Sequence, residues 1–276
     1  MNPRPLQTVR IFALALSAIV AVVASAPANA RADAAPISPK LAAVQAAGKL
    51  QVCIWPHYYG ISMRDPRFPE PLGVDADMAK AFARELNVKL EFVDSELGLI
   101  VPDLNADRCD LAMTGLLVLP ERQAVVRFAK PHLRTDVYAV VAKNNRVIQR
   151  WRDLDQPGIA VGVVAGSHHY ALMRERMRYA SVTSFEHNGA RELETGRIDA
   201  YIVTFPFTRR VIDRFEWARV IVPERSFQSI PMAYAVRAGD ELWLARLDQF
   251  VATIKRDGRL AAAAKRYGLG EMLVRD

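Results

Sequence analysis

The chain has 276 residues, of which 51% are hydrophobic, and a formal net charge of +7 at pH 7. This hydrophobic content is ample for a core, and the length allows either one large domain or two lobes. The basic residues are scattered and mostly offset by acids, which argues against nucleic acid as a partner and is compatible with small anionic ligands.

Residues 1–30 have the three parts of a secretory signal peptide in order. Two arginines, Arg4 and Arg10, precede the apolar run Ile11 to Ala26, and Ala28-Asn29-Ala30 supplies the small residues of a cleavage site. The apolar run is shorter than the roughly 20 residues of a membrane span, and no later stretch is long enough. We therefore expect a periplasmic, soluble protein whose signal peptide is cleaved after Ala30.

Two cysteines, Cys53 and Cys109, follow the signal. An even number of cysteines in an exported chain favours a disulfide, because export removes the reducing environment of the cytosol. The alternative is a pair of buried free thiols. Neither cysteine lies directly after the cleavage site, so a lipid anchor there is not expected.

Strand-like and helix-like segments alternate from Leu50 onward. The first group predicts the order β-α-β-α-β, which is typical of a mostly parallel sheet covered by helices. Its helix carries one apolar stripe with a period of four residues, Val74, Met78, Phe82 and Leu86. The segments, in chain order, are a strand at 50–54, this helix, a strand at 89–93, a helix at 99–105 and a strand at 110–113.

The same alternation starts again in the second half of the mature chain. Its segments are a strand at 159–163, a helix at 168–178, a strand at 181–185, a helix near Arg191 and a strand at 200–203. We interpret the two groups as two α/β lobes. Two further strand-like runs, Tyr138 to Ala142 and Met232 to Arg237, flank the second group and are expected to cross between the lobes. A helical tail, Glu241 to Tyr267, should return to the first lobe.

The fold class is therefore a two-lobed α/β architecture in which each lobe is a mostly parallel sheet flanked by helices. The expected boundaries are 41–142 for the first part of lobe 1, 143–231 for lobe 2 and 232–276 for the return to lobe 1. Ligands of such sheets collect at the carboxyl ends of the strands. This rule nominates a cleft lined from 55–62, Leu97, 114–122, 165–169 and 204–206.

Several segments at these positions resemble the amino-acid-type (family 3) periplasmic solute-binding proteins of ABC importers. The most specific is Leu119-Pro120-Glu121-Arg122, and the resemblance covers about 49–268. Further matching segments are 48–52, 72–79, 126–128, 161–167, 196–200, 233–237 and 255–258. The resemblance implies two lobes joined by hinge strands, capture of an amino acid or related organic acid by lobe closure, and a membrane permease as partner.

The resemblance also implies roles for individual residues. Arg122 matches the arginine that grips a ligand carboxylate, and Tyr58 matches the aromatic residue that stacks on the ligand. The remaining expected ligand-binding residues are Trp55, Leu97, Thr114, Gly115, Leu117, Ser167, His168 and Thr204. Ser167 and His168 match a helix start whose free backbone N–H groups attract anions. Of the adjacent pair His168 and His169, one is expected to face the cleft and the other solvent.

Two positions depart from the pattern of the family. Thr204 stands where relatives usually carry the acid that holds the ligand ammonium, and Trp55 stands where an early acid is common. A ligand with a free α-ammonium is therefore not expected. An anion, or a more apolar molecule bearing a carboxylate, fits these substitutions.

Two other functions remain open at this point. One is a lyase like the cyclohexadienyl dehydratases, which resemble the same family and need a buried general acid. The other is a periplasmic accessory or sensory subunit, like the binding-protein relatives that accompany quinoprotein dehydrogenases. A binding protein without enzymatic activity, cofactor or metal, working as a monomer, is the favoured interpretation. Adjacent histidines lack the i, i+4 spacing of a zinc site, and no nucleophile motif is present.

Overall fold

The computed structural model describes residue 1, residues 37–186 and residues 189–274. The expected signal peptide, residues 1–30, lies outside the described residues apart from Met1. Two five-stranded sheets and one two-stranded sheet organise the described part of the chain. The expected α/β fold class is confirmed.

The first sheet has the strand order β2-β1-β3-β12-β4. Its strands are β1 (Lys49–Ile54), β2 (Lys89–Asp94), β3 (Leu111–Ala112), β4 (Val126–Phe128) and β12 (Ala235–Arg237). Strand β1 runs parallel to β2 and β3, and β12 runs antiparallel to β3 and β4. The helices of this lobe are α1 (Pro39–Ala47), α2 (Val74–Glu85), α3 (Ile100–Asn105), α4 (Pro120–Gln123), α8 (Glu241–Arg256), α9 (Arg259–Arg266) and the 3-10 turn η2 (Gly270–Met272).

Apolar periodicity explains how α2 sits on this sheet. The stripe Val74, Met78 and Phe82 is buried, and Leu86 closes it one residue past the helix end. Phe82 packs against Trp243 and Phe250 of α8, with ring centroids 5.6 and 4.6 Å away. These contacts place α8 against α2, in the lobe to which the helical tail was expected to return.

The second sheet has the strand order β10-β6-β9-β7-β8. Its strands are β6 (Val137–Ala142), β7 (Ala160–Val164), β8 (Ser181–Phe185), β9 (Ala200–Thr204) and β10 (Ala218–Ile221). The parallel strands are β7, β8 and β9, and β6 runs antiparallel to its neighbours β9 and β10. The helices of this lobe are η1 (Trp151–Leu154), α5 (His168–Arg176), α6 (Gly189–Glu194) and α7 (Phe205–Arg214).

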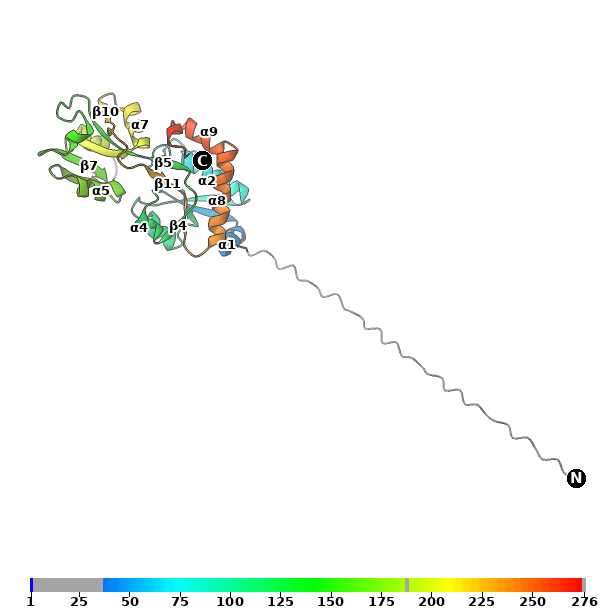
Figure 1. The fold of residues 1–276 in the computed structure, drawn as a ribbon. Helices are drawn as coiled ribbons and strands as arrows, with labels where there is room; N and C mark the ends of the chain where they lie inside the picture. The colour runs from blue at the N-terminus through cyan, green and yellow to red at the C-terminus, as the bar shows by residue number, and fades with distance from the viewer. Residues whose placement is uncertain (2–36, 187–188, 275–276) are drawn as a thin grey trace. The chain divides into compact units, whose positions relative to one another are not determined.

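The crossings between the lobes differ from the expected ones. Strands β5 (Leu133–Thr135) and β11 (Ile230–Met232) pair with each other in an antiparallel two-stranded sheet. Figure 1 shows this pair between the two groups of elements. The interpretation of 138–142 as a crossing strand is wrong, because this apolar run is β6, inside the second sheet. Likewise, half of the expected crossing at 232–237, residues 235–237, is β12 of the first sheet, and Met232 is the last residue of β11. The first crossing therefore falls before Val137, and the expected limit at 142 lies within the second sheet.

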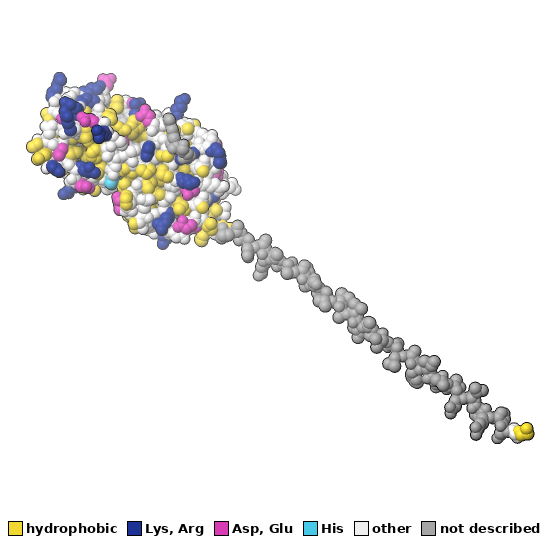
Figure 2. Space-filling model, viewed as in Figure 1, with side chains coloured by type: hydrophobic (Ala, Val, Ile, Leu, Met, Phe, Trp, Pro, Cys, Tyr) yellow, Lys and Arg dark blue, Asp and Glu magenta, His cyan; other side chains and the backbone are white. Residues whose placement is uncertain are grey.

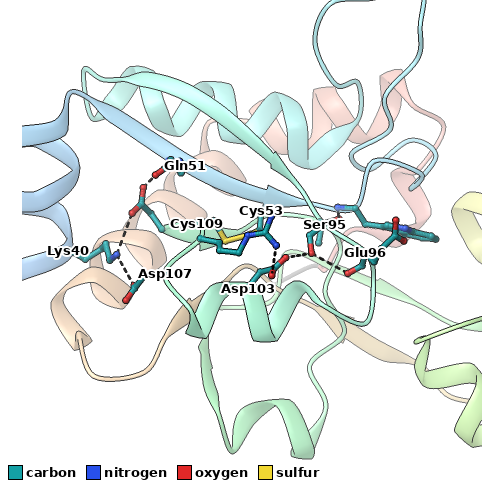
Figure 3. Close-up of a disulfide and its surroundings, with 12 residues drawn as sticks. Lys40, Gln51, Cys53, Ser95, Glu96, Asp103, Asp107 and Cys109 are labelled. Carbon is teal, nitrogen blue, oxygen red and sulfur yellow. Dashed lines mark hydrogen bonds and ion pairs between the residues drawn. A yellow bond between two sulfur atoms is a disulfide. The ribbon is translucent and has the colours of Figure 1, made fainter. Parts of the chain in front are cut away.

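A disulfide joins Cys53 of β1 to Cys109, in the segment that leads into β3, as expected (Figure 3). The two Cα atoms lie 5.5 Å apart. Neighbouring polar contacts hold the same segment, including an ion pair of 2.8 Å between Arg108 and Asp103, whose carboxylate also accepts a hydrogen bond from Ser95. The disulfide thus fixes the chain two residues before Trp55, where the first strand ends at the cleft.

The surface mixes charges of both signs. On the face shown in Figure 2, the Lys and Arg side chains are scattered around the two lobes among acidic and apolar ones. Within the described ranges, no helix has both the length and the apolar character needed to cross a bilayer.

Candidate ligand-binding site

The described chain has a cavity of about 50 Å³ between the carboxyl end of β1 on one side and those of β7 and β9 on the other. All the expected ligand-binding residues except Thr114 line it. They are Trp55, Tyr58, Leu97, Gly115, Leu117, Arg122, Ser167, His168 and Thr204. Residues that the strand-end rule nominated on both lobes thus come together around one cavity.

Contacts across the cleft bring the two lobes together. The Tyr58 hydroxyl lies 3.1 Å from the Thr204 hydroxyl, within hydrogen-bonding distance. Phe207 of the second lobe stacks on Tyr58, with ring centroids 5.5 Å apart and an interplanar angle of 18°. At the rim, a Cβ atom on Gly166 would lie 3.0 Å from the Cα of Gly98. These contacts define a closed arrangement of the cleft.

The first-lobe wall rests on a buried carboxylate. Asp75 accepts hydrogen bonds from the backbone N–H of Gly115 at 2.5 Å and from the Tyr234 hydroxyl at 3.2 Å. His132 Nε2 lies 2.9 Å from the same carboxylate. Gly115 has a φ of +59°, and a Cβ atom there would lie 3.0 Å from the Tyr58 ring, so only glycine fits at this position.

Thr114 does not line the cavity. It is fully buried, and its hydroxyl accepts a hydrogen bond of 2.9 Å from the backbone N–H of Trp55. The same hydroxyl lies 2.8 Å from the Ser62 hydroxyl, which in turn donates to the Trp55 carbonyl at 3.0 Å. Thr114 therefore positions the backbone of Trp55 from behind and does not reach the cleft.

Arg122 is the charged group of the cavity. It is half-buried, and its guanidinium donates a hydrogen bond of 3.2 Å to the Leu117 carbonyl. Among the described residues it forms no ion pair, although the exposed Glu121 is its chain neighbour. Burial lowers the pKa of Arg122, and Glu121 and Tyr58 act in the opposite direction. Because a guanidinium has a very high ordinary pKa, Arg122 remains a cation at neutral pH.

The second-lobe wall presents the start of α5. Ser167 donates its hydroxyl to the Val164 carbonyl at 2.6 Å, so this side chain stabilises the turn itself. The expectation that only one of the two histidines faces the cleft is wrong, because both His168 and His169 line the cavity. Both histidines belong to the first turn of α5, so the N-terminal end of this helix lies at the cleft. His168 Nε2 lies 3.1 Å from the Gln228 side-chain oxygen.

Two buried nitrogens of the cavity residues have no hydrogen-bond partner within the described structure, Nε1 of Trp55 and Nε2 of His169. Burial, followed by the charges of His168 and Arg122, lowers the pKa of His169 to about 4, so the imidazole is neutral at physiological pH. Burial also raises the pKa of the Tyr58 hydroxyl. Unsatisfied buried polar atoms are costly, so both nitrogens are candidates for contacts with a bound molecule.

Two further lining residues, Leu116 and His169, lie within the segments that the strand-end rule nominated. Other lining residues lie outside these segments and were not expected from the sequence; they are Val164, Tyr201, Ile202, Val203 and Phe207. Phe207 lies one residue beyond the segment that the strand-end rule nominated. The lining is mostly apolar and aromatic, and none of these cavity residues is an acid. Among the described residues, no group of histidine, cysteine or acidic side chains has the arrangement to hold a metal ion.

The cleft is closed between two lobes that two short strands connect, and it has apolar walls with a few polar groups. These features define a two-lobed ligand-binding protein. Residues 50–270 match the family model of the bacterial extracellular solute-binding proteins, family 3. The chain belongs to this family, and the family resemblance drawn from the sequence is confirmed.

Known relatives agree with this assignment. The amino-acid-binding protein AabA of Dichelobacter nodosus is 24% identical over 220 residues, which cover 77% of this chain and 85% of AabA. The histidine-binding periplasmic protein of Salmonella typhimurium is 24% identical over 208 residues, covering 72% and 79% of the two chains. Among solved structures, the ancestral amino-acid-binding protein AncCDT-1, a precursor of cyclohexadienyl dehydratase, is 28% identical with a TM-score of 0.76, covering 82% of this chain and 98% of AncCDT-1.

Proposed function

We propose that this protein is the periplasmic substrate-binding component of an ABC importer and captures a small solute that bears a carboxylate. In this proposal it is exported with a cleaved signal peptide, works as a monomer and delivers its ligand to a membrane permease. Its relatives include amino-acid-binding and periplasmic proteins. The observation that carries the proposal is the guanidinium of Arg122, which lies in the closed cavity without an ion-pair partner among the described residues.

A carboxylate is the ligand group that fits Arg122 best. The planar guanidinium offers a fork of donors that matches two carboxylate oxygens. The start of α5 lies on the opposite wall, and its free N–H groups favour negative charge. The partnerless Trp55 Nε1–H adds a further donor in the same cavity. Closure would thus surround an anionic group with donors from both lobes.

The rest of the ligand should lack a free α-ammonium. None of the residues that line the cavity is an acid. Thr204 stands at the position where relatives usually carry an acidic residue, and its hydroxyl faces Tyr58. An ammonium brought into this cavity would lose its hydration without gaining a counter-ion. Organic acids, or amino acids with a modified amino group, should therefore bind more tightly than ordinary amino acids.

A lyase is the second candidate, because one similar solved structure is an amino-acid-binding precursor of cyclohexadienyl dehydratase. Such an enzyme needs a general acid poised in the cleft. No carboxyl group lines the cavity, and His169 is neutral at physiological pH because its pKa is about 4. These observations support binding without turnover. Release of product from prephenate or arogenate would instead support the lyase.

A ligand screen followed by one pair of variants tests the proposal. Thermal-shift measurements with amino acids, aliphatic dicarboxylates and aromatic acids should identify an acid without an ammonium as ligand. Arg122→Ala should then weaken its binding by roughly thirtyfold or more, since losing one partner of a buried charge pair costs about 2–5 kcal/mol. Arg122→Lys should restore little, because an ammonium cannot reproduce the two-pronged geometry.

The matched control is Arg127→Ala, which removes an exposed arginine of the same lobe that lies 3.8 Å from Glu241. It should leave the affinity unchanged. Normal binding by Arg122→Ala, with an unchanged melting temperature, would refute the role of Arg122. Submicromolar binding of Glu, Gln, Arg, Lys or His would refute the argument against an ammonium.

A further inference from the structure

A second pair of arginines lies beside the ligand cavity. Arg210 and Arg214 are one turn apart on α7 and line a neighbouring cavity of about 330 Å³. The two cavities share four wall residues, and three of these are aromatic. The shared residues are Trp55, Val164, Tyr201 and Phe207. The Arg210 cavity therefore adjoins the cavity that contains Arg122 along these side chains.

Neither Arg210 nor Arg214 forms an ion pair with any described residue. Arg210 is partly buried, and no side-chain hydrogen bond of its guanidinium is found within the described ranges. The Arg214 guanidinium lies over the ring of Phe215, 5.7 Å from its centroid. Burial, followed by the charge of Arg214, lowers the pKa of Arg210. The partly buried Arg210 cation thus lies near the exposed Arg214 cation and has lost part of its hydration, an arrangement that an anion would stabilise.

Two acids that share a further cavity with this pair have partners already. Asp65 and Asp213 line an adjoining cavity together with the two arginines. Asp65 forms an ion pair of 2.6 Å with Arg67, and Asp213 lies 3.5 Å from Arg209. No acid lines the cavity that Arg210 shares with the aromatic residues. The described lining of this cavity therefore supplies no counter-ion to Arg210.

We propose that Arg210, assisted by Arg214, binds a second anionic group of the same ligand. The inference rests on the proposed function, in which Arg122 binds the first carboxylate. A ligand that spans both cavities would lie along the aromatic residues between them, with one acidic group at each end. The preferred substrate class is therefore a dicarboxylate with an apolar or aromatic centre, rather than a monocarboxylate.

Matched pairs of acids test this proposal by calorimetry. The probes are terephthalate with benzoate, adipate with hexanoate, and suberate with octanoate, so that each pair differs in one carboxylate. At least one dicarboxylate should bind wild type roughly tenfold or more tightly than its partner, the value of one charge-assisted contact. In Arg210→Ala this ratio should fall to about one, while the affinity for the monocarboxylate stays within about twofold.

Arg209→Ala is the matched control, because it removes an exposed arginine of the same helix and the same charge. It should retain the dicarboxylate preference. If Arg210→Ala does not fold, Arg210→Gln provides the same test. The proposal is overturned if no dicarboxylate is preferred, if none of the six probes binds, if the preference survives in Arg210→Ala, or if Arg209→Ala abolishes it equally.

Arg122→Ala separates this inference from the proposed function. One outcome is that Arg122→Ala binds the monocarboxylates more weakly than wild type does, while wild type binds no dicarboxylate more tightly than its matched monocarboxylate. In that case only the second site fails. If neither class of acid responds to Arg122→Ala, the proposed function itself fails.

Discussion

The disulfide between Cys53 and Cys109 should stabilise the first lobe strongly. It closes a loop across a sequence separation of 56 residues that contains α2, β2 and α3. Chain-entropy arguments assign a loop of this length about 4 kcal/mol at 25 °C. Both cysteines are buried. The double variant Cys53→Ala and Cys109→Ala removes the crosslink and, because both residues are replaced, leaves no lone thiol.

The effect on thermal stability follows from the size of the protein. For a chain of this length, about 1 kcal/mol corresponds to roughly 2–4 °C, so the variant should melt about 8–16 °C below wild type. Circular dichroism melts of both proteins, with and without reductant, measure this difference. Reductant should lower the melting temperature of wild type to that of the variant and leave the melting temperature of the variant unchanged.

Two results would refute this reasoning. One is the recovery of two alkylated cysteines per chain from unreduced, denatured wild type, which would show that the bond does not form. The other is a melting temperature of the variant within about 2 °C of oxidised wild type, which would show that the crosslink contributes little to stability.

The remaining predictions concern the cleft and its support. Gly166→Leu should keep the lobes apart, because even a Cβ atom at this position would lie 3.0 Å from Gly98 in the closed form. Small-angle scattering should show a larger radius of gyration for the variant than for wild type. An unchanged radius of gyration would contradict the contact. Asp75→Asn should reduce the free energy of unfolding, measured in urea, by about 2–3 kcal/mol, because the buried carboxylate accepts hydrogen bonds from several donors. A reduction below about 0.5 kcal/mol would count against the role of this hydrogen-bond network in stability. The pKa of His169 in the fold is about 4, whereas the unfolded chain takes up this proton near pH 6.5. Wild type should therefore lose about 3 kcal/mol more stability than His169→Asn as the pH falls from about 7 to about 4, and parallel pH profiles of the two proteins would refute the lowered pKa.

Local patterns were sufficient to predict most elements of the fold. The period of four residues in α2 and the apolar runs of β1 and β9 depend only on which faces are buried, and the structure places them as expected. The crossings could not be predicted in the same way. The hinge strand β5 has the sequence Leu-Arg-Thr and carries no apolar run that would mark it as a strand. β6 follows it closely and is an apolar run, but its sequence does not show which sheet it joins.

The cavity was predictable at the ends of strands and less so elsewhere. Arg122 and Tyr58 follow from the strand-end rule and the family resemblance, and both line the cavity. Thr114 also follows a strand, but its side chain points to the back of Trp55, and this direction depends on the partner that its hydroxyl finds. Phe207 was missed because it belongs to the first turn of α7 and reaches the cavity only through the way that helix packs.

The hydroxyl pair of Tyr58 and Thr204 gives closure a free energy that comes from the chain alone. Every ligand benefits from this contribution to the same extent, because the bond involves no ligand atom. The bond therefore sets a part of the affinity that all ligands share, whereas the cavity residues that touch a ligand set the differences between ligands.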